Sequence, residues 1–272
     1  MELSPKISKE DEVGSPTSSK PKNWSRKPLF FSESKVGDPS LRYICWLDVM
    51  GTKSTMLWSI KMVSNFVMKL HVAALEERPP FPEVELFPVI DGIYLCTVNQ
   101  RQLLDLLKNI FVRLVVSFIV QADPFYRFMV RGALAYCPVL KGEGLKKGSD
   151  ILHSNENECY CDSMLLGMPL SQTYEAAREA APFGLYVHES ARAFAPVDTE
   201  VIPYIHWKWW KHSRFSEPGL IEELKEKLKE HFAWCESHPK TILYDSKSIE
   251  RHAALAKEYF EWDDRQLRKQ VS

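Results

Sequence analysis

The chain has 272 residues, of which 45% are hydrophobic and 26% charged, and its formal net charge is −1. This composition is typical of a globular protein with one large domain and an extension. The near-neutral charge gives no general attraction to nucleic acid or to anionic membranes. No apolar run reaches the roughly 20 residues that a membrane-spanning helix needs. The first residues lack a signal-peptide core, so we expect a cytoplasmic protein with no nucleic-acid partner and no direct membrane association.

The chain divides into three parts by composition. Residues 1–38 are rich in Ser, Lys, Pro and Glu, which predicts a disordered N-terminal tail. Residues 39–196 contain most of the strand and helix patterns and form the predicted main domain. Residues 197–272 are expected to add a C-terminal strand and helices that pack on the same domain. The six cysteines do not form a disulfide pattern, and we interpret them as reduced thiols.

The first half of the chain predicts strands and helices in a definite order. Residues 41–49 form an apolar run that stops at a glycine, as a buried strand does. A helical pattern follows over 54–75. Two short apolar runs, 84–90 and 93–98, are separated only by Asp91-Gly92, which is a strong hairpin signal. Pro88 in the first of these runs indicates an edge strand or a bulge.

The second half extends this order. A helix at 100–122 and a strand at 127–139 complete the series strand, helix, hairpin, helix, strand. This series predicts an α+β fold with a ferredoxin-like βαββαβ core. Beyond it we expect a loop at 140–163 and a helix at 165–181. Strands at 184–188 and 201–210 and charged helices at 220–235 and 246–262 should follow.

Two carboxylates have positions that suit metal chemistry. Asp48 ends the first strand and Asp91 lies at the hairpin, so both meet at one edge of the sheet if these strands are neighbours. With the Val49 carbonyl they would offer the oxygen ligands that hard divalent cations prefer. A helix N-terminus at Gly51 and Thr52 would attract phosphate. The alternatives are that Asp91 only favours the turn and that Asp48 is only a helix cap.

Four segments together resemble the catalytic core of class III nucleotidyl cyclases, a palm-like fold. In particular they resemble the bacterial pyrimidine cyclases of the Pycsar antiphage systems. The resemblance covers about residues 42 to 194. The segments are Trp46-Leu47-Asp48-Val49-Met50-Gly51, Ile90-Asp91-Gly92-Ile93-Tyr94, Arg131-Gly132-Ala133-Leu134 and Gly167-Met168-Pro169-Leu170-Ser171-Gln172-Thr173-Tyr174-Glu175.

The resemblance implies a specific activity. Asp48 and Asp91 would be the catalytic carboxylates and, with Val49, would bind two Mg²⁺ or Mn²⁺ ions. Arg131 would contact the triphosphate of the nucleoside triphosphate substrate, next to Gly51 and Thr52. The implied enzyme is a lyase, a uridylate cyclase that converts UTP (or CTP) to the 3′,5′-cyclic nucleotide and pyrophosphate as an antiviral second messenger. Its sites would lie between the subunits of a homodimer.

Several residues depart from purine-specific cyclases. Ser171 and Glu175 replace an Asn and a transition-state Arg, and Phe87 replaces the base-selecting Lys. Adenylate or guanylate cyclase activity is therefore not expected. The departures are compatible with a pyrimidine substrate and equally with an inactive relative.

Two further departures are from the pyrimidine cyclases. Cys137 stands where a glycine is usual, and Ala177 and Arg178 follow the helix where other residues are expected. They motivate the alternative of a catalytically inactive, nucleotide- or partner-binding dimer. Arg178, one turn further along the helix, is a candidate for the missing cation.

A cluster of aromatic and basic residues at 206–210 has two interpretations. It is either a stacking surface for a base or, more commonly, a strand whose aromatic residues belong to the core. A sheet-based RNA binder of similar topology is a third possible class. Against this class, the chain lacks both the aromatic pair expected on the strands of such a binder and a basic net charge.

Overall fold

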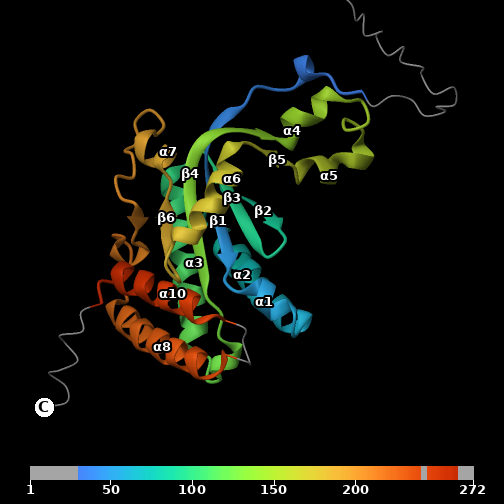
Figure 1. The fold of residues 1–272 in the computed structure, drawn as a ribbon. Helices are drawn as coiled ribbons and strands as arrows, with labels where there is room; N and C mark the ends of the chain where they lie inside the picture. The colour runs from blue at the N-terminus through green and yellow to red at the C-terminus, as the bar shows by residue number, and fades with distance from the viewer. Residues whose placement is uncertain (1–29, 240–243, 263–272) are drawn as a thin grey trace, which may run out of the picture.

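The computed structural model of the protein describes residues 30–239 and 244–262 (Figure 1). Its centre is a seven-stranded mixed sheet in the order β2-β3-β1-β4-β6-β7, with β5 paired to β4 beside this path. The strands are β1 (Ser40–Val49), β2 (Glu85–Val89), β3 (Gly92–Thr97), β4 (Val130–Lys141), β5 (Leu165–Leu166), β6 (Leu185–Val187) and β7 (His206–Trp207).

The first four strands and their helices form the predicted ferredoxin-like core. β1 lies between β3 and β4 and pairs antiparallel with both, and β2 pairs antiparallel with β3 at the edge of the sheet. The edge position explains how β2 tolerates Pro88, which cannot donate a hydrogen bond to a neighbouring strand. The α+β fold predicted from the order of elements is therefore confirmed.

The two faces of the sheet carry different layers. Helices α2 (Ile60–Glu77) and α3 (Gln100–Val120) cover one face and α6 (Met168–Ala176) covers part of the other (Figure 1). The larger core fills the space under α2 and α3, and includes Leu47, Leu70 and Phe111. The smaller core under α6 includes Trp46 and Tyr94. Because side chains alternate along a strand, neighbours such as Trp46 and Leu47 belong to opposite layers.

The helix predicted at 54–75 is broken in two. A short α1 (Thr52–Met56) comes first, and α2 begins only at Ile60. Ser59 has an extended backbone, and its side chain accepts a hydrogen bond from the Met62 backbone N–H, which makes it the N-cap of α2. The apolar periodicity continued across this cap and concealed the break.

The hairpin is confirmed, but its turn is displaced by one residue. Val89 pairs with Gly92, so the turn residues are Ile90 and Asp91 and not Asp91 and Gly92. Ile90 takes a positive φ of 49°, which is uncommon for a β-branched residue. Gly92 is required for packing: a Cβ there would lie 2.3 Å from the Trp46 ring. The Asp-Gly pair therefore reflects the neighbouring strand and not the turn.

Residues 140–163 are not a plain loop. They contain α4 (Gly142–Leu145), α5 (Glu158–Asp162) and two 3-10 turns. Part of the predicted disordered tail packs here, since Ser32 N–H donates to the Gly148 carbonyl at 2.8 Å and Gly37 N–H to the Gly144 carbonyl at 3.1 Å. The disorder predicted for residues 30–38 is thus corrected, and residues 1–29 lie outside the described residues.

The C-terminal part is mostly helical. Helices α8 (Pro218–Ser237) and α10 (Ser246–Tyr259) lie together at one end of the sheet, and a short α7 (Glu189–Ala193) lies towards the other end (Figure 1). The predicted helices 165–181, 220–235 and 246–262 are present with shifted ends, the first of them continuing from α6 as a 3-10 turn at Ala177–Glu179. Within the described residues, no helix is both long and apolar enough to cross a membrane.

The predicted strand 201–210 is reduced to β7 and a 3-10 turn at Trp209–Lys211. Trp209 is fully buried, and its Nε1–H donates to the Phe183 carbonyl at 2.7 Å. Trp207 is also buried. These two rings are therefore core residues, which favours the structural interpretation of the aromatic cluster over the stacking surface.

Candidate active site

Asp48, Asp91 and Arg131 meet at one end of the sheet. Asp48 is next to the last residue of β1, and its Cα partners are Gly92 on β3 and Arg131 on β4. Asp91 directly precedes Gly92 in the hairpin turn. The convergence of two carboxylates expected from the strand order is therefore present. Val49 ends β1 at the same place, with its side chain in the larger core.

The carboxylate of Asp48 is held in an unfavourable environment. Its side chain is only 18% exposed, and the nearest cation is Arg131, whose Nε lies 3.6 Å from Asp48 Oδ2. Burial raises the pKa of Asp48 to about 6, Arg131 opposes this rise, and the negative charge of Asp91 adds to it. The Arg131 Nε is itself buried without a hydrogen-bond partner. The arginine therefore compensates the carboxylate only in part.

Asp91 is held by Thr52. The Thr52 hydroxyl donates a hydrogen bond to Asp91 Oδ2, and Thr52 is buried. Gly51 precedes it with a left-handed φ of 78°, a conformation that glycine adopts without strain. The expectation of a phosphate-binding helix N-terminus is weakened here. The helix that starts at Thr52 has only five residues, and the Thr52 hydroxyl is already engaged.

Arg178 adds a second cation. It lies in the 3-10 turn that follows α6, with its guanidinium 5.9 Å from the centre of the Tyr174 ring. Its positive charge lowers the pKa of Asp48, which places it within electrostatic range of the carboxylate pair. Arg178, the candidate to replace the absent transition-state arginine, therefore lies near Asp48.

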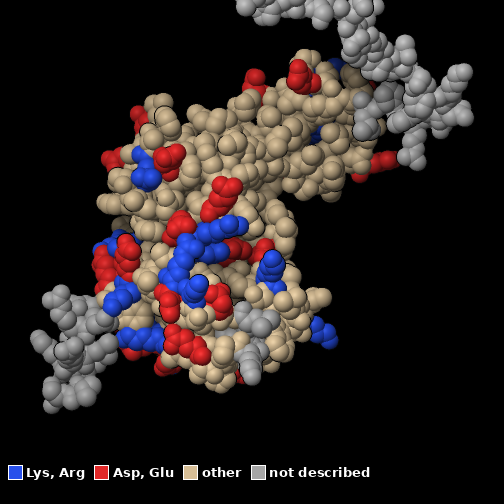
Figure 2. Space-filling model, in the orientation of Figure 1, with Lys and Arg blue, Asp and Glu red and all other residues tan. Residues whose placement is uncertain are grey.

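The C-terminal helix α10 braces this region, which sequence reasoning missed. Arg251 Nη2 donates to Glu179 Oε1 at 2.8 Å and to the Arg178 carbonyl at 3.1 Å. Figure 2 shows the result as a group of basic side chains with acidic ones among and beside them, in the region where α6 and α10 lie in Figure 1. No local signal marks Arg251, because its partners are about 70 residues earlier in the chain.

Aromatic contacts hold α6 against the sheet. The Trp46 ring lies 4.5 Å from the Tyr94 ring and 6.0 Å from the Tyr174 ring, centre to centre. The Tyr94 hydroxyl donates to the Leu170 carbonyl at 3.1 Å. Cys137, one of the departures noted above, donates from Sγ to Gln172 Oε1 at 3.4 Å. This cysteine therefore has a packing role between β4 and α6.

The donor set at this end suits a hard divalent cation. Among the described residues no group of three or more His, Cys, Asp or Glu side chains could hold a metal ion. A cation here would depend on Asp48, Asp91 and main-chain or substrate oxygens, which is how Mg²⁺ is commonly bound together with phosphates. The raised pKa of Asp48 points the same way, because a positive ion would relieve the repulsion between the carboxylates.

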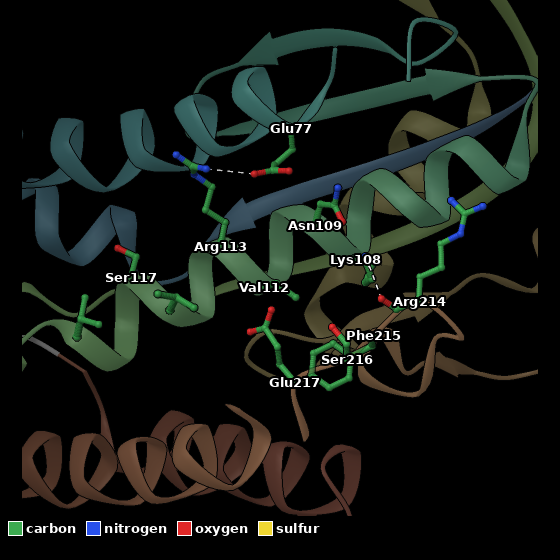
Figure 3. A pocket seen from close by; sticks show the side chains of 12 residues that line it. Glu77, Lys108, Asn109, Val112, Arg113, Ser117, Arg214, Phe215, Ser216 and Glu217 are labelled. Carbon is green, nitrogen blue, oxygen red and sulfur yellow. Dashed lines mark hydrogen bonds and ion pairs between the residues drawn. The ribbon is translucent and has the colours of Figure 1, made fainter. Parts of the chain in front are cut away.

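A wider hollow lies on the helical side of the molecule and is separate from the carboxylates (Figure 3). It has a volume of about 680 Å³ between the end of α2, the outer face of α3 and residues 214–217. Several of its charged groups are already engaged: Arg113 pairs with Glu77 at 3.1 Å and Lys108 donates to the Arg214 carbonyl at 3.4 Å. The residues that line this hollow include neither Asp48 nor Asp91.

Comparison with known proteins gives similarity in structure only. No protein-family model and no curated protein sequence matches the chain. Among solved structures, the monomeric guanylyl cyclase domain of the RhoGC fusion protein from the aquatic fungus Blastocladiella emersonii is 12% identical, with a TM-score of 0.44 over 58% of this chain and 86% of that one. The guanylyl cyclase Cya2 is 12% identical, with a TM-score of 0.42 over 58% and 79%.

A bacterial light-regulated adenylyl cyclase is also similar, at 10% identity and a TM-score of 0.40 over 57% of this chain and 45% of that chain. These values are too low to assign an activity. Any activity has to be inferred from the residues of this chain.

Proposed function

We propose that this protein is a metal-dependent nucleotidyl cyclase that converts a pyrimidine nucleoside triphosphate to its 3′,5′-cyclic nucleotide and pyrophosphate. UTP is the first candidate substrate and CTP the second. The observation that carries the proposal is the meeting of Asp48, near the end of β1, and Asp91, in the β2–β3 turn, at one end of the sheet beside Arg131. A largely buried carboxylate whose pKa is raised, as that of Asp48 is by burial and by the charge of Asp91, is a recognised sign of a functional site.

In this reaction the 3′-oxygen of the substrate forms a bond to the α-phosphorus, the bond to pyrophosphate breaks, and the hydroxyl proton is released. Asp48, Asp91 and the Val49 carbonyl would hold two Mg²⁺ or Mn²⁺ ions. Such ions, when bound, lower the pKa of the hydroxyl group and neutralise phosphate charge.

The remaining roles belong to residues around the carboxylates. Arg131 and Arg178 would each offer a planar guanidinium to phosphate oxygens. Thr52 fixes the orientation of Asp91 through its hydrogen bond, and Gly51 allows the chain to turn beside the triphosphate. Arg131 would exchange its distant contact with Asp48 for a phosphate oxygen when substrate binds.

The choice of a pyrimidine base rests on what this chain lacks. Phe87 occupies the position of the purine-selecting lysine in the resemblance and is buried in the smaller core. Ser171 and Glu175 stand in place of the Asn and Arg of purine cyclases. A buried phenyl ring cannot supply the hydrogen bond that a lysine gives to a purine. This absence supports UTP or CTP over ATP and GTP.

A homodimer is part of the proposal. Large apolar side chains near the carboxylate end are not covered by the described chain: Ile90 is 89% exposed and Tyr174 50%. A second subunit placed across this face would bury them. Ile90→Glu is expected to shift the protein to the monomer in light scattering, whereas Val197→Glu, at a remote and equally exposed position, leaves the dimer intact.

The experiment that tests the activity is direct. Purified protein is incubated with each of the four nucleoside triphosphates and Mn²⁺, and cyclic product is measured by mass spectrometry. We expect product from UTP or CTP, loss of product with EDTA, and none from Asp91→Asn. Product from none of the four substrates would rule out the cyclase.

A second function is favoured by one observation. Both carboxylates already have partners, since Asp48 faces Arg131 and Asp91 accepts from Thr52. A protein that only binds a nucleotide or a partner would need no more than this. Calorimetric binding of UTP without turnover would support this inactive dimer in place of the cyclase.

The role in antiphage defence rests on the resemblance of the sequence motifs. It predicts that bacterial cells expressing the protein accumulate cyclic pyrimidine nucleotide after phage infection, and that cells expressing Asp91→Asn do not. Equal product levels in infected and uninfected cells would contradict the defence role and leave the cyclase activity standing.

A further inference from the structure

A second cavity lies close to the carboxylates but is lined by other residues. It has a volume of about 210 Å³ and is lined by residues just after β1, helices α1 and α2, residues 124–129 before β4, the helix α8, Tyr244 and Asp245, and the helix α10. Its wall includes Met50 and Gly51, which directly follow Asp48 and Val49, but neither of those two residues. The cavity therefore neighbours the candidate active site without sharing its carboxylates.

One wall of the cavity is aromatic. The Phe66 and Phe128 rings are stacked with their centres 5.2 Å apart and their planes inclined by 16°. Phe125 and the methionines Met50, Met62 and Met129 extend this apolar lining. Flat apolar surfaces of this kind favour a planar ring as occupant.

Each of two buried polar side chains on the cavity wall has one nitrogen without a hydrogen-bond partner. The side chain of Arg127 is 4% exposed, and its Nη1 makes no hydrogen bond, the nearest carboxylate being Glu230 at 3.7 Å. Its Nε is satisfied by the Gln121 carbonyl at 2.9 Å. His231 is 5% exposed and its Nδ1 has no partner. Buried polar groups of this kind are normally satisfied, so the pair points to a missing acceptor.

The size of the cavity restricts the occupant. Pockets for drug-sized ligands measure about 300–1,000 Å³. A space of about 210 Å³ admits a single ring with one polar group and excludes a nucleoside triphosphate. Arg127 is the buried cation of the wall, and the one carboxylate among the lining residues, Asp245, is exposed and accepts a hydrogen bond from the Ser248 N–H. A negatively charged polar group therefore fits better than a positive one.

We propose that this cavity is a binding site for a small aromatic monoanion, with its ring against the Phe66 and Phe128 wall and its carboxylate accepting from Arg127 and His231. This site adjoins the substrate site at Gly51 but contains neither Asp48 nor Asp91, and it does not rest on the proposed function. A chain that lacks cyclase activity would still bind the ligand.

The same cavity has a physical connection to the candidate active site. Tyr244 and His252 line it and are hydrogen-bonded to each other through the hydroxyl and Nδ1. Tyr244 lies within electrostatic range of Arg131, and the positive charge of Arg131 contributes to the lowered pKa of His252. The charge of an occupant would thus act on the arginine that faces Asp48.

The test uses 4-fluorobenzoate as the probe and the full-length protein, with binding followed by fluorine NMR. We expect saturable binding at one site, and binding of the neutral isostere 4-fluorobenzamide weaker by about tenfold or more. Arg127→Met should weaken binding of the benzoate by a similar factor. Thermal unfolding shows whether this variant folds.

A matched pair of substitutions on α10 decides the case even if Arg127→Met does not fold. Ser248 lines the cavity, so Ser248→Leu should fill it and abolish binding. Ser246, at the first position of the same helix, is exposed and does not line the cavity, so Ser246→Leu should bind normally. Unchanged binding in Ser248→Leu, equal affinity for the benzoate and the benzamide, or displacement of the probe by UTP would each overturn the proposal.

Discussion

The two ends of the central strands differ in how far their acidic side chains are paired with cations. At the end opposite the candidate site, Glu85 lies between two cations, with Lys141 Nζ at 2.7 Å and Arg42 Nη1 at 3.6 Å. At the other end two acidic residues, Asp48 and Asp91, lie near each other, and the ion-pair partner of Asp48 is Arg131, whose Nε is 3.6 Å from Asp48 Oδ2. The same strands therefore carry one cluster in which the negative charge is compensated and one in which it is compensated only in part.

This difference separates stability from function. The compensated cluster obeys the usual preference for paired charges. The partly compensated cluster keeps two acids together, and burial increases the free-energy cost of their charges. Local conflicts of this kind are expected where a ligand completes the arrangement. The following predictions test whether the Asp48 end is the functional one.

The largest effect is expected from the carboxylates themselves. Asp48→Asn and Asp91→Asn should each lower turnover by roughly a thousandfold or more, which corresponds to about 4 kcal/mol of transition-state stabilisation. The measurement is cyclic product per minute with Mn²⁺. Glu85→Gln, at the compensated end, serves as the matched control and should retain turnover within about twofold. Retained activity in either aspartate variant would contradict the two-ion site.

Arg178 should have the next largest effect. Its removal in Arg178→Gln is expected to lower kcat by about a hundredfold, because a cation near developing phosphate charge is worth about 3 kcal/mol. The KM for the triphosphate should change less than kcat. Arg178→Lys should recover part of the rate, since it keeps the charge and loses the planar fork. A change in KM alone would instead make Arg178 a binding residue.

Asp48 should also cost the protein stability at neutral pH. Its pKa is raised to about 6 in the folded protein, so between about pH 4 and 6 the folded chain keeps a proton that the unfolded chain has lost. Stability from this group therefore falls as pH rises through that window. Asp48→Asn should be more stable than the wild type at pH 7.5 by on the order of 2 kcal/mol, and no more stable at pH 4.

Urea unfolding at the two pH values measures this difference. Glu85→Gln should show the opposite sign at pH 7.5, with a loss below about 1 kcal/mol, because it breaks a partly exposed ion pair. If Asp48→Asn gave no gain at pH 7.5, the Asp48 carboxylate would not be strained in the metal-free protein.

The smallest effect is expected from Thr52. Thr52→Val removes the hydroxyl that holds Asp91, and a single hydrogen bond is worth about 1 kcal/mol, so turnover should fall by less than about tenfold. Thr52→Ser keeps the hydroxyl and should remain close to wild type. An effect as large as that of Asp91→Asn would give Thr52 a direct role at the substrate.

Much of this arrangement follows from local sequence. The apolar run that ends at Asp48, the hairpin around Asp91 and the strand that begins near Arg131 were predictable, because strand and helix periods are written in neighbouring residues. Their order also predicted the ferredoxin-like sheet. The turn itself was misplaced, since Gly92 is required by the Trp46 ring on the adjacent strand and not by the turn.

Tertiary structure decided what surrounds these carboxylates. Arg251 reaches Arg178 and Glu179 from a helix about 70 residues further along the chain, and the wall of the second cavity joins Phe66, Arg127, His231 and Ser248. Burial and charge compensation depend on such distant neighbours, which no local pattern records. The sequence by itself therefore determined which acids meet at the sheet end. Only packing decided that Asp48 is partly compensated, that Thr52 holds Asp91, and that a second cavity lies beside them.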